Sequence, residues 1–170
     1  KPSEDEGITD ALAKILDVAE SASVKGIEFD YWEQYGLGRA AEIAGRFELA
    51  EGYYKQALRG FKNIQNQMGE WNCLSGLGII EGERGNLDEA EILFKESLAI
   101  CQELGDQSGT SMSLGNLGNV AEKRRDWDEA ERLQKESLAI CRVLGHRLGE
   151  AKSLDALGGI ARERGDLDEA

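Results

Sequence analysis

The feature that most constrains this chain is an internal repeat with a period of 40 residues. The dipeptide Leu-Gly stands at positions 37, 77, 117 and 157, each 40 residues from the last. Segments 71–110 and 111–150 are identical at 19 of their 40 positions, far more than chance would produce. A period of this length is typical of repeat architectures, in which each unit is one supersecondary element stacked on the next.

Within one unit, the spacing of apolar residues predicts two helices. In the third unit the first helix shows apolar residues at intervals of three, four and seven, namely Leu114, Leu117, Val120 and Ala121. A second helix is predicted from about Trp127 to Leu144, with Gly145 as its C-terminal stop. No segment alternates with a period of two, so we expect no strand.

The turn between the two helices carries repeated capping signals. Asp126 is a good N-cap, and Glu129 three residues later completes a capping-box pattern. The pairs Asn86 with Glu89 and Asp166 with Glu169 stand at the same places in neighbouring units. Before these caps, Gly85 and Gly165 predict left-handed residues. Arg125 replaces glycine there, so we expect a slightly strained turn.

At this point the residues resemble the tetratricopeptide repeat, whose pattern is W-x2-L-G-x2-Y, then A-x3-F, then P. The matching residues are Leu74, Leu77-Gly78, Ala90 and Phe94, and in the first unit Leu37-Gly38, Ala50 and Tyr54. The resemblance runs from Tyr31 to Ala170. The departures are leucine or Gln34 at the tryptophan position, Glu81, Ala121 and Ala161 at the tyrosine position, Gln134 for the aromatic residue of the third unit, and no closing proline. The long period is similar to that of kinesin light chains, Leu-Gly-Asn-repeat adaptors and bacterial signalling regulators.

The resemblance implies an all-α fold, a right-handed α-solenoid of antiparallel helix pairs. We divide the chain into a polar tail and capping helix at 1–30, repeats at 31–70, 71–110 and 111–150, and a partial repeat at 151–170. The helix expected from Ile8 to Lys25 is either a cap, which we favour, or a degenerate second helix. The last helix stops after one turn, so either the native protein continues or the chain was cut, and the uncovered apolar end could pair with another copy.

In this family the first helix of each pair lines a concave surface that binds peptides. Carried over residue by residue, the resemblance places twelve residues on that surface: Trp32, Tyr35, Arg39, Asn72, Ser75, Ile79, Met112, Asn119, Lys123, Lys152, Asp155 and Arg162. Trp32, Tyr35 and Arg39 are of types enriched at binding hot spots, although the two rings could instead cover the apolar end of the first pair. Asn119 can offer a donor and an acceptor to an extended peptide, or can simply be solvated.

Composition and chemistry exclude several classes of function. The net charge of −13 repels phosphate backbones and anionic membranes, so we expect neither nucleic acid nor membrane as a partner. His146 is the single histidine, and we interpret Cys73, Cys101 and Cys141 as small buried residues. We therefore expect no catalytic residue, metal or cofactor. The odd cysteine count and the polar N-terminus favour a cytoplasmic protein.

The sequence thus predicts a non-enzymatic module that binds a peptide or helix of a partner protein. Two alternatives stay open: a regulatory or sensor segment of a larger signalling or transcription-regulator protein, and a self-assembling solenoid.

Overall fold

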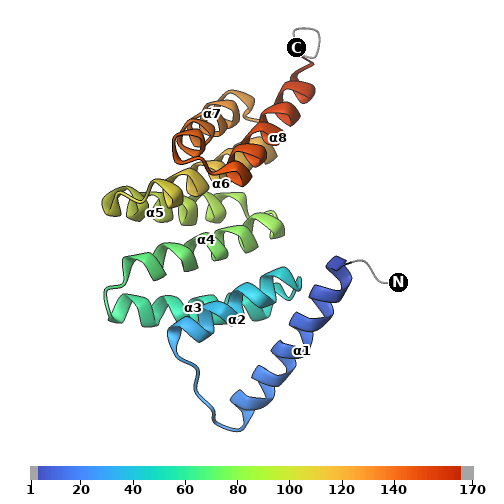
Figure 1. Ribbon diagram of the computed structural model, residues 1–170, viewed down its shortest axis with the longest axis vertical. Coiled ribbons are helices and arrows are strands. Elements are labelled where there is room, and N and C mark those ends of the chain that lie inside the picture. The colour runs from blue at the N-terminus through green and yellow to red at the C-terminus, as the bar shows by residue number, and fades with distance from the viewer. Residues whose placement is uncertain (1–3, 166–170) are drawn as a thin grey trace. The chain divides into compact units, whose positions relative to one another are not determined.

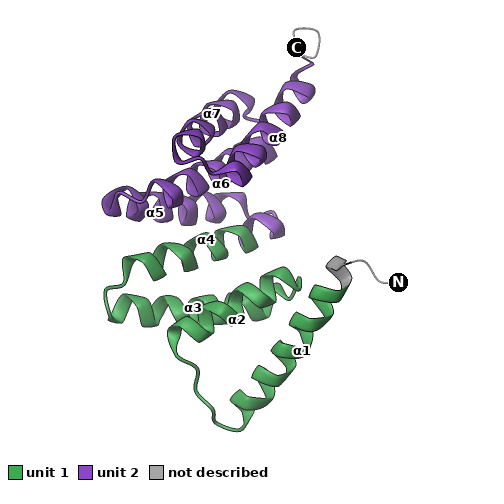
Figure 2. Cartoon of the chain, viewed as in Figure 1, with its two compact units in different colours: residues 1–80 green, residues 81–170 purple. Residues whose placement is uncertain are grey.

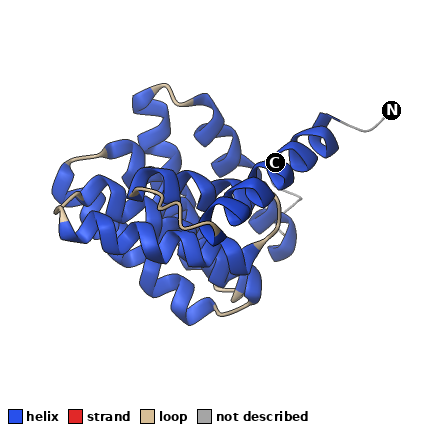
Figure 3. Cartoon of the chain, turned by 90° about the horizontal axis from the view of Figure 1, so that it is seen from below, coloured by secondary structure: helices blue, strands red, loops and turns tan. Residues whose placement is uncertain are grey.

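The computed structural model describes residues 4–165, and for side chains residues 7–165. Within that range the chain is helical, with short turns and no strand (Figures 1 and 3). The helices are α1 (Glu4–Val24), α2 (Tyr31–Ile43), α3 (Phe47–Asn63), α4 (Gln67–Arg84), α5 (Leu87–Leu104), α6 (Gln107–Lys123), α7 (Trp127–Leu144) and α8 (Arg147–Arg164). The predicted all-α class of helix pairs is confirmed, and α7 has the bounds predicted from its apolar spacing.

The chain forms two compact units, residues 1–80 and 81–170 (Figure 2). Helix α4 crosses the boundary, so its first turns belong to unit 1 and its last turn to unit 2. Each unit is described by itself below.

Unit 1 is built around aromatic side chains of α3 that pack against glycines. Tyr54 and Phe61 are fully buried. A Cβ atom placed on Gly69 would lie 2.3 Å from the Phe61 ring, and one on Gly76 would lie 2.5 Å from the Tyr54 ring. Only glycine therefore lets the backbone of α4 approach α3 this closely, which explains why Gly69 and Gly76 stand inside a helix despite the low helix propensity of glycine.

Helix α1 packs on α2 through one face and leaves another exposed. Leu16 and Ala19 are buried, whereas Ile15 and Val18 are exposed. Arg46, which precedes α3, forms ion pairs with Asp17 (3.0 Å) and Glu20 (2.6 Å) and so ties α1 to the turn between α2 and α3.

In unit 2, α6 is the central helix, in contact with both α5 and α7, and α7 in turn packs on α8. The four apolar residues predicted to face the core from α6 are all buried: Leu114, Leu117, Val120 and Ala121. A seam of buried serines joins successive helices. The hydroxyl oxygens of Ser97 and Ser113 lie 3.1 Å apart, and those of Ser137 and Ser153, one period later, lie 3.2 Å apart. Each hydroxyl thereby gains a partner and can be buried at low cost.

Ion pairs also follow the 40-residue period. Arg124 at the end of α6 pairs with Asp88 and Glu91 of α5, and Arg164 at the end of α8 pairs with Asp128 and Glu131 of α7. Exposed pairs of this kind add little stability each. The arrangement is nevertheless the same in two consecutive repeats: one arginine pairs with two carboxylates of the preceding helix.

The capping predictions are partly confirmed. Gly85, Gly105, Gly145 and Gly165 are left-handed, and Arg125 adopts φ 61° in the same place. Asp126 accepts a hydrogen bond from the backbone N–H of Glu129 (3.3 Å), but the Glu129 carboxylate is held by Arg132, so only half of the capping box forms.

Asn86 is the N-cap residue of α5, as expected, but the capping box with Glu89 is wrong, because the Asn86 side chain makes no capping hydrogen bond and its amide donates to Glu81 (2.6 Å). A complete box that the sequence analysis does not predict stands at Asp30 and Glu33. The pair Asp166 and Glu169 lies outside the described residues.

We expect Gly69→Ala to lower the free energy of unfolding by roughly 1–3 kcal/mol, because the added methyl group must displace the buried Phe61 ring. Gly36→Ala in α2 is the matched control, since nothing lies within 4 Å of its Cβ position. This control should raise stability by up to about 1 kcal/mol through helix propensity. Urea unfolding followed by circular dichroism measures both, and equal effects of the two substitutions would contradict the close-packing argument.

We expect Arg125→Gly to stabilise the protein by about 0.5–1 kcal/mol, because a left-handed residue with a Cβ atom carries strain that exceeds the entropy cost of glycine. Gly85→Ala introduces the reverse change at the matching turn and should destabilise. Thermal unfolding of both variants checks the signs, and a loss of stability in Arg125→Gly would show that the turn is not strained.

Candidate functional site

An open groove with a volume of about 700 Å³ lies between α6 and α8 in unit 2. We call it the α6–α8 groove. Its walls carry Met112, Gly115, Asn119 and Glu122 from α6, and Lys152, Asp155, Gly159 and Arg162 from α8. Its floor is made by Gln134, Ser137 and Cys141 of α7.

Five of the twelve residues placed on the concave surface by sequence line this groove: Met112, Asn119, Lys152, Asp155 and Arg162. They meet because the corresponding positions of two first helices face each other across the intervening second helix. Lys123 lies outside the groove. Its ammonium group binds the carbonyl of Gly82 (2.9 Å) and the carboxylate of Glu83 (3.1 Å), so it fastens the end of α6 to the last turn of α4.

Glycines stand in both walls of the groove. A Cβ atom on Gly115 would lie 3.6 Å from the Ser137 hydroxyl, and one on Gly159 would lie 3.6 Å from the Glu122 carboxylate. These are ordinary van der Waals distances, unlike the closer approaches to aromatic rings at Gly69 and Gly76 in unit 1. At the position that corresponds to Gly115, unit 1 carries Tyr35, and at the position of Gly159 it carries Arg39.

In unit 1 the predicted residues largely contact one another. The Trp32 ring, 44% exposed, packs edge-on against Phe61 with centroids 4.6 Å apart, and Tyr35 is tilted against Tyr54. The hydroxyl of Tyr35 donates to the side-chain oxygen of Asn72 (3.3 Å). The pKa of Arg39 is raised, chiefly by a hydrogen bond with Tyr35. These contacts favour the alternative interpretation, in which the rings cover the apolar end of the first helix pair.

Two further predicted residues of unit 1 present little surface. Ser75 is buried, with 7% of its area exposed, and Ile79 is half-buried. The unit 1 set is therefore a poorer candidate for binding than the α6–α8 groove.

Gln134 is a groove residue that the sequence analysis does not predict. Its side chain is 2% exposed, and its amide nitrogen donates to the backbone carbonyl of Gly115 (3.0 Å) and to the side-chain oxygen of Asn119 (2.8 Å). The sequence did contain a signal, because Gln134 interrupts the aromatic series of Tyr54 and Phe94. A polar residue at a buried, otherwise aromatic position needs partners, and here the partners lie in the groove.

The charged side chains of the groove are not neutralised by one another. Glu122, Lys152, Asp155 and Arg162 form no ion pair among the described residues. Burial raises the pKa of the Glu122 carboxyl, and the nearby carboxylates of Asp155 and Glu163 raise that pKa further. The groove therefore holds charges of both signs that retain capacity for outside partners.

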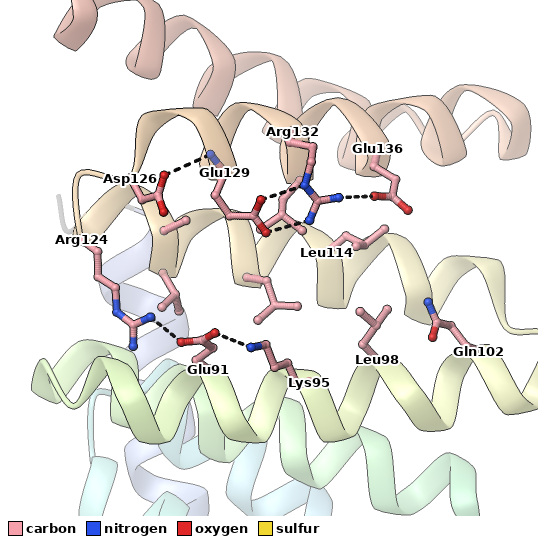
Figure 4. A pocket seen from close by; sticks show the side chains of 14 residues that line it. Glu91, Lys95, Leu98, Gln102, Leu114, Arg124, Asp126, Glu129, Arg132 and Glu136 are labelled. Carbon is pink, nitrogen blue, oxygen red and sulfur yellow. Dashed lines mark hydrogen bonds and ion pairs between the residues drawn. The ribbon is translucent and has the colours of Figure 1, made fainter.

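A second, smaller cavity of about 380 Å³ lies between α5 and α7, with α6 beneath it. We call it the α5–α7 slot. Figure 4 shows Lys95 and Leu98 on one side, Glu129 and Arg132 on the other, and Leu114 between them. Its charges are paired: Lys95 and Arg124 with Glu91, and Arg132 with Glu129 and Glu136. Because these pairs already satisfy each other, the slot is the weaker candidate.

The cysteines are free and buried, as expected. Burial raises the pKa of the Cys73 thiol to about 12 and that of Cys101 to about 11, so both are neutral near pH 7 and are poor nucleophiles. Within the described residues, no group of three or more histidine, cysteine or acidic side chains is placed to hold a metal ion. No described helix is both long and apolar enough to cross a membrane.

Comparison with known proteins agrees with the repeat geometry. Residues 71–142 and 109–170 match the model of the tetratricopeptide repeat. The chain belongs to the tetratricopeptide repeat family. The resemblance read from Leu77-Gly78 and Ala90-x3-Phe94 is thereby confirmed. No curated protein matches the sequence significantly.

Solved structures share the fold at low sequence identity. A Rap protein complexed with Competence and Sporulation Factor superposes with a TM-score of 0.82 at 16% identity, over 98% of this chain and 47% of that one. BtubC (BKLC) from P. vanneervenii gives 0.72 at 20% identity, over 81% and 57%. A putative kinesin light chain from Podosopora anserina gives 0.67 at 16% identity, over 95% and 81%. This chain spans about half the length of the first solved structures that it matches.

We expect Glu122→Gln to stabilise the protein at pH 7. The folded state raises the pKa of Glu122, so it disfavours the ionised form. That penalty is present above the folded-state pKa and is absent below the ordinary glutamate pKa of about 4.3. The advantage of the glutamine variant should therefore vanish near pH 3.5, about one unit below that value. Urea midpoints at the two pH values test this, with Glu96→Gln on the exposed face of α5 as the control. A stability loss at pH 7 would contradict the predicted environment.

Proposed function

We propose that this chain is a protein–protein interaction module that binds a peptide or helical segment of a partner in the α6–α8 groove. The observation that carries the proposal is the set of unpaired charged and polar side chains around an open cavity. Elsewhere on unit 2, Arg124, Arg132 and Arg164 each form ion pairs with carboxylates. Charges that lack an internal partner in a groove are available to a ligand.

The composition of the groove suits a polypeptide better than a small molecule or nucleic acid. Met112 and Leu148 offer apolar contact, Asn119 offers a hydrogen-bonding group, and Lys152 and Arg162 offer positive charge. The overall charge of −13 opposes nucleic acid. Membership of the tetratricopeptide repeat family supports a protein or peptide partner, and the Rap protein with a similar fold was solved in complex with Competence and Sporulation Factor.

A regulatory role within a larger protein is the second candidate. Its support is that the chain corresponds to about half of the Rap proteins whose fold it shares. In that case the groove would still receive the regulating polypeptide, and the effector would lie in another part of the protein.

The inferred setting is non-enzymatic and cytoplasmic. Burial raises the pKa of the Cys73 and Cys101 thiols and makes them poor nucleophiles, which supports a binding role over catalysis. Free cysteines suit a reducing compartment.

We expect Gly159→Gln to weaken peptide binding without unfolding the protein. The Cβ position of Gly159 borders the groove with no neighbour closer than 3.6 Å, so a long side chain fits there but occupies the ligand's space. Gly158→Gln is the matched control, because Gly158 is exposed, does not line the groove and has nothing within 4 Å of its Cβ position. The probes are fluorescent peptides selected from a random library on the wild-type chain.

Fluorescence anisotropy should show at least about ten-fold weaker binding to Gly159→Gln, the expected scale for losing a few groove contacts. The Gly158→Gln chain should bind like the wild type. Equal binding to all three proteins would exclude the α6–α8 groove as the binding site.

A further inference from the structure

Gln134, which is buried at the groove floor, determines which group of the Asn119 side chain is available to a ligand. Gln134 stands where other repeats carry an aromatic residue, and its buried amide nitrogen donates to Gly115 and Asn119 in the groove wall. A Cβ atom on Gly118 would lie 2.7 Å from the Gln134 amide nitrogen, so Gly118 is what leaves room for this side chain beneath α6. Tyr54 packs on Gly38 in the corresponding way in unit 1, with 2.8 Å between the ring and the Cβ position.

The hydrogen bonds determine which way each amide group points. The backbone carbonyl of Gly115 can only accept, so the Gln134 atom facing it at 3.0 Å must be the NH2 group. The same NH2 group lies 2.8 Å from the Asn119 side chain, which must therefore present its oxygen to Gln134. The Asn119 NH2 group is consequently left without a partner among the described residues, on a side chain that lines the groove.

We propose that Gln134 is a positioning residue that turns the Asn119 NH2 group towards the groove, so that the groove selects an extended polypeptide through one of its backbone carbonyls. This inference rests on the proposed function of the groove. It narrows the choice between a peptide strand and a helix: a helix uses its carbonyls internally, except in its last turn, whereas an extended segment presents them to a neighbour.

The charges of the groove favour a neutral carbonyl over a carboxylate at this position. Glu122 lies one helical turn after Asn119 on α6, and Asp155 lies on the opposite wall. Two acidic groups near the donor oppose a negatively charged guest atom, while a peptide carbonyl is tolerated. We therefore expect Asn119 to bind a backbone carbonyl of the peptide. Lys152, Arg162 and the apolar residues Met112 and Leu148 would then select among the peptide's side chains.

A double-mutant cycle separates positioning from a merely structural role. Gln134→Met keeps the volume but cannot hold Asn119, and Asn119→Ala removes the donor. With a library-selected peptide as probe, we expect each single variant to bind about five-fold more weakly, as for loss of one hydrogen bond. When Asn119→Ala is already present, adding Gln134→Met should have almost no further effect. Equal losses from Gln134→Met with and without Asn119→Ala would overturn the positioning role.

A second experiment tests whether the bound peptide is extended or helical. The same peptide, locked as a helix by a side-chain staple, should bind at least about ten-fold more weakly than the linear form, because its carbonyls are engaged internally. Equal or tighter binding of the stapled peptide would overturn the extended-guest inference while leaving the groove as the binding site. If the library yields no peptide that Gly159→Gln weakens, the proposed function itself fails.

A measurement on the protein without ligand tests whether Gln134 holds Asn119, whatever the binding experiments show. In the full chain, side-chain amide protons of Gln134 should exchange with solvent far more slowly than those of the exposed Gln102, because Gln134 is 2% exposed and its amide nitrogen donates two hydrogen bonds. Gln134→Met should shift the Asn119 side-chain amide signals in an NMR spectrum. Exchange of Gln134 as fast as that of Gln102, or unchanged Asn119 signals, would show that the two side chains are not coupled.

Discussion

Close approach of helices at glycine is the constraint on which the rest of the structure depends. A lone helix pair cannot bury its apolar face, so each pair must pack on the next, and the packing distance is set by what stands at the contact. Gly69 and Gly76 receive the rings of Phe61 and Tyr54 in unit 1, and Gly118 receives Gln134 in unit 2. Two of the repeated Leu-Gly dipeptides mark such a contact, because Gly38 receives the ring of Tyr54 and Gly118 receives Gln134.

Other glycines of the first helices line the binding candidate. Gly115 and Gly159 stand in the walls of the α6–α8 groove, where a Cβ atom would make only ordinary van der Waals contacts. In unit 1 the corresponding residues are Tyr35 and Arg39, and the aromatic side chains contact one another instead. Helix pairs with a similar backbone can thus carry a groove or a surface covered by aromatic side chains, depending on a few residues. The fold alone therefore does not determine whether a repeat can bind a ligand.

The surface of unit 2 contains one region whose charges are paired and another whose charges are not. Arginines at the ends of α6 and α8 are matched to carboxylates of the preceding helix, and the α5–α7 slot is rimmed by completed ion pairs. In the α6–α8 groove the charges have no such partners among the described residues, and Gln134 and Asn119 supply a directed hydrogen-bond donor. Paired charges add little to recognition because a ligand must first separate them, whereas unpaired ones are ready to bind.

Sequence alone determined the repeat, the all-α class, the bounds of α7 and the buried face of α6, because these depend on local periodicity and on glycine at left-handed turns. The resemblance to the tetratricopeptide repeat also pointed to five residues that line the groove. Only the tertiary structure decided that Ser75 is buried, that Lys123 binds the end of α4, and that Asn86 pairs with Glu81. It also revealed Gln134 as the partner of Asn119. Those outcomes depend on which side chains from separate helices meet, and periodicity within one helix carries no information about that.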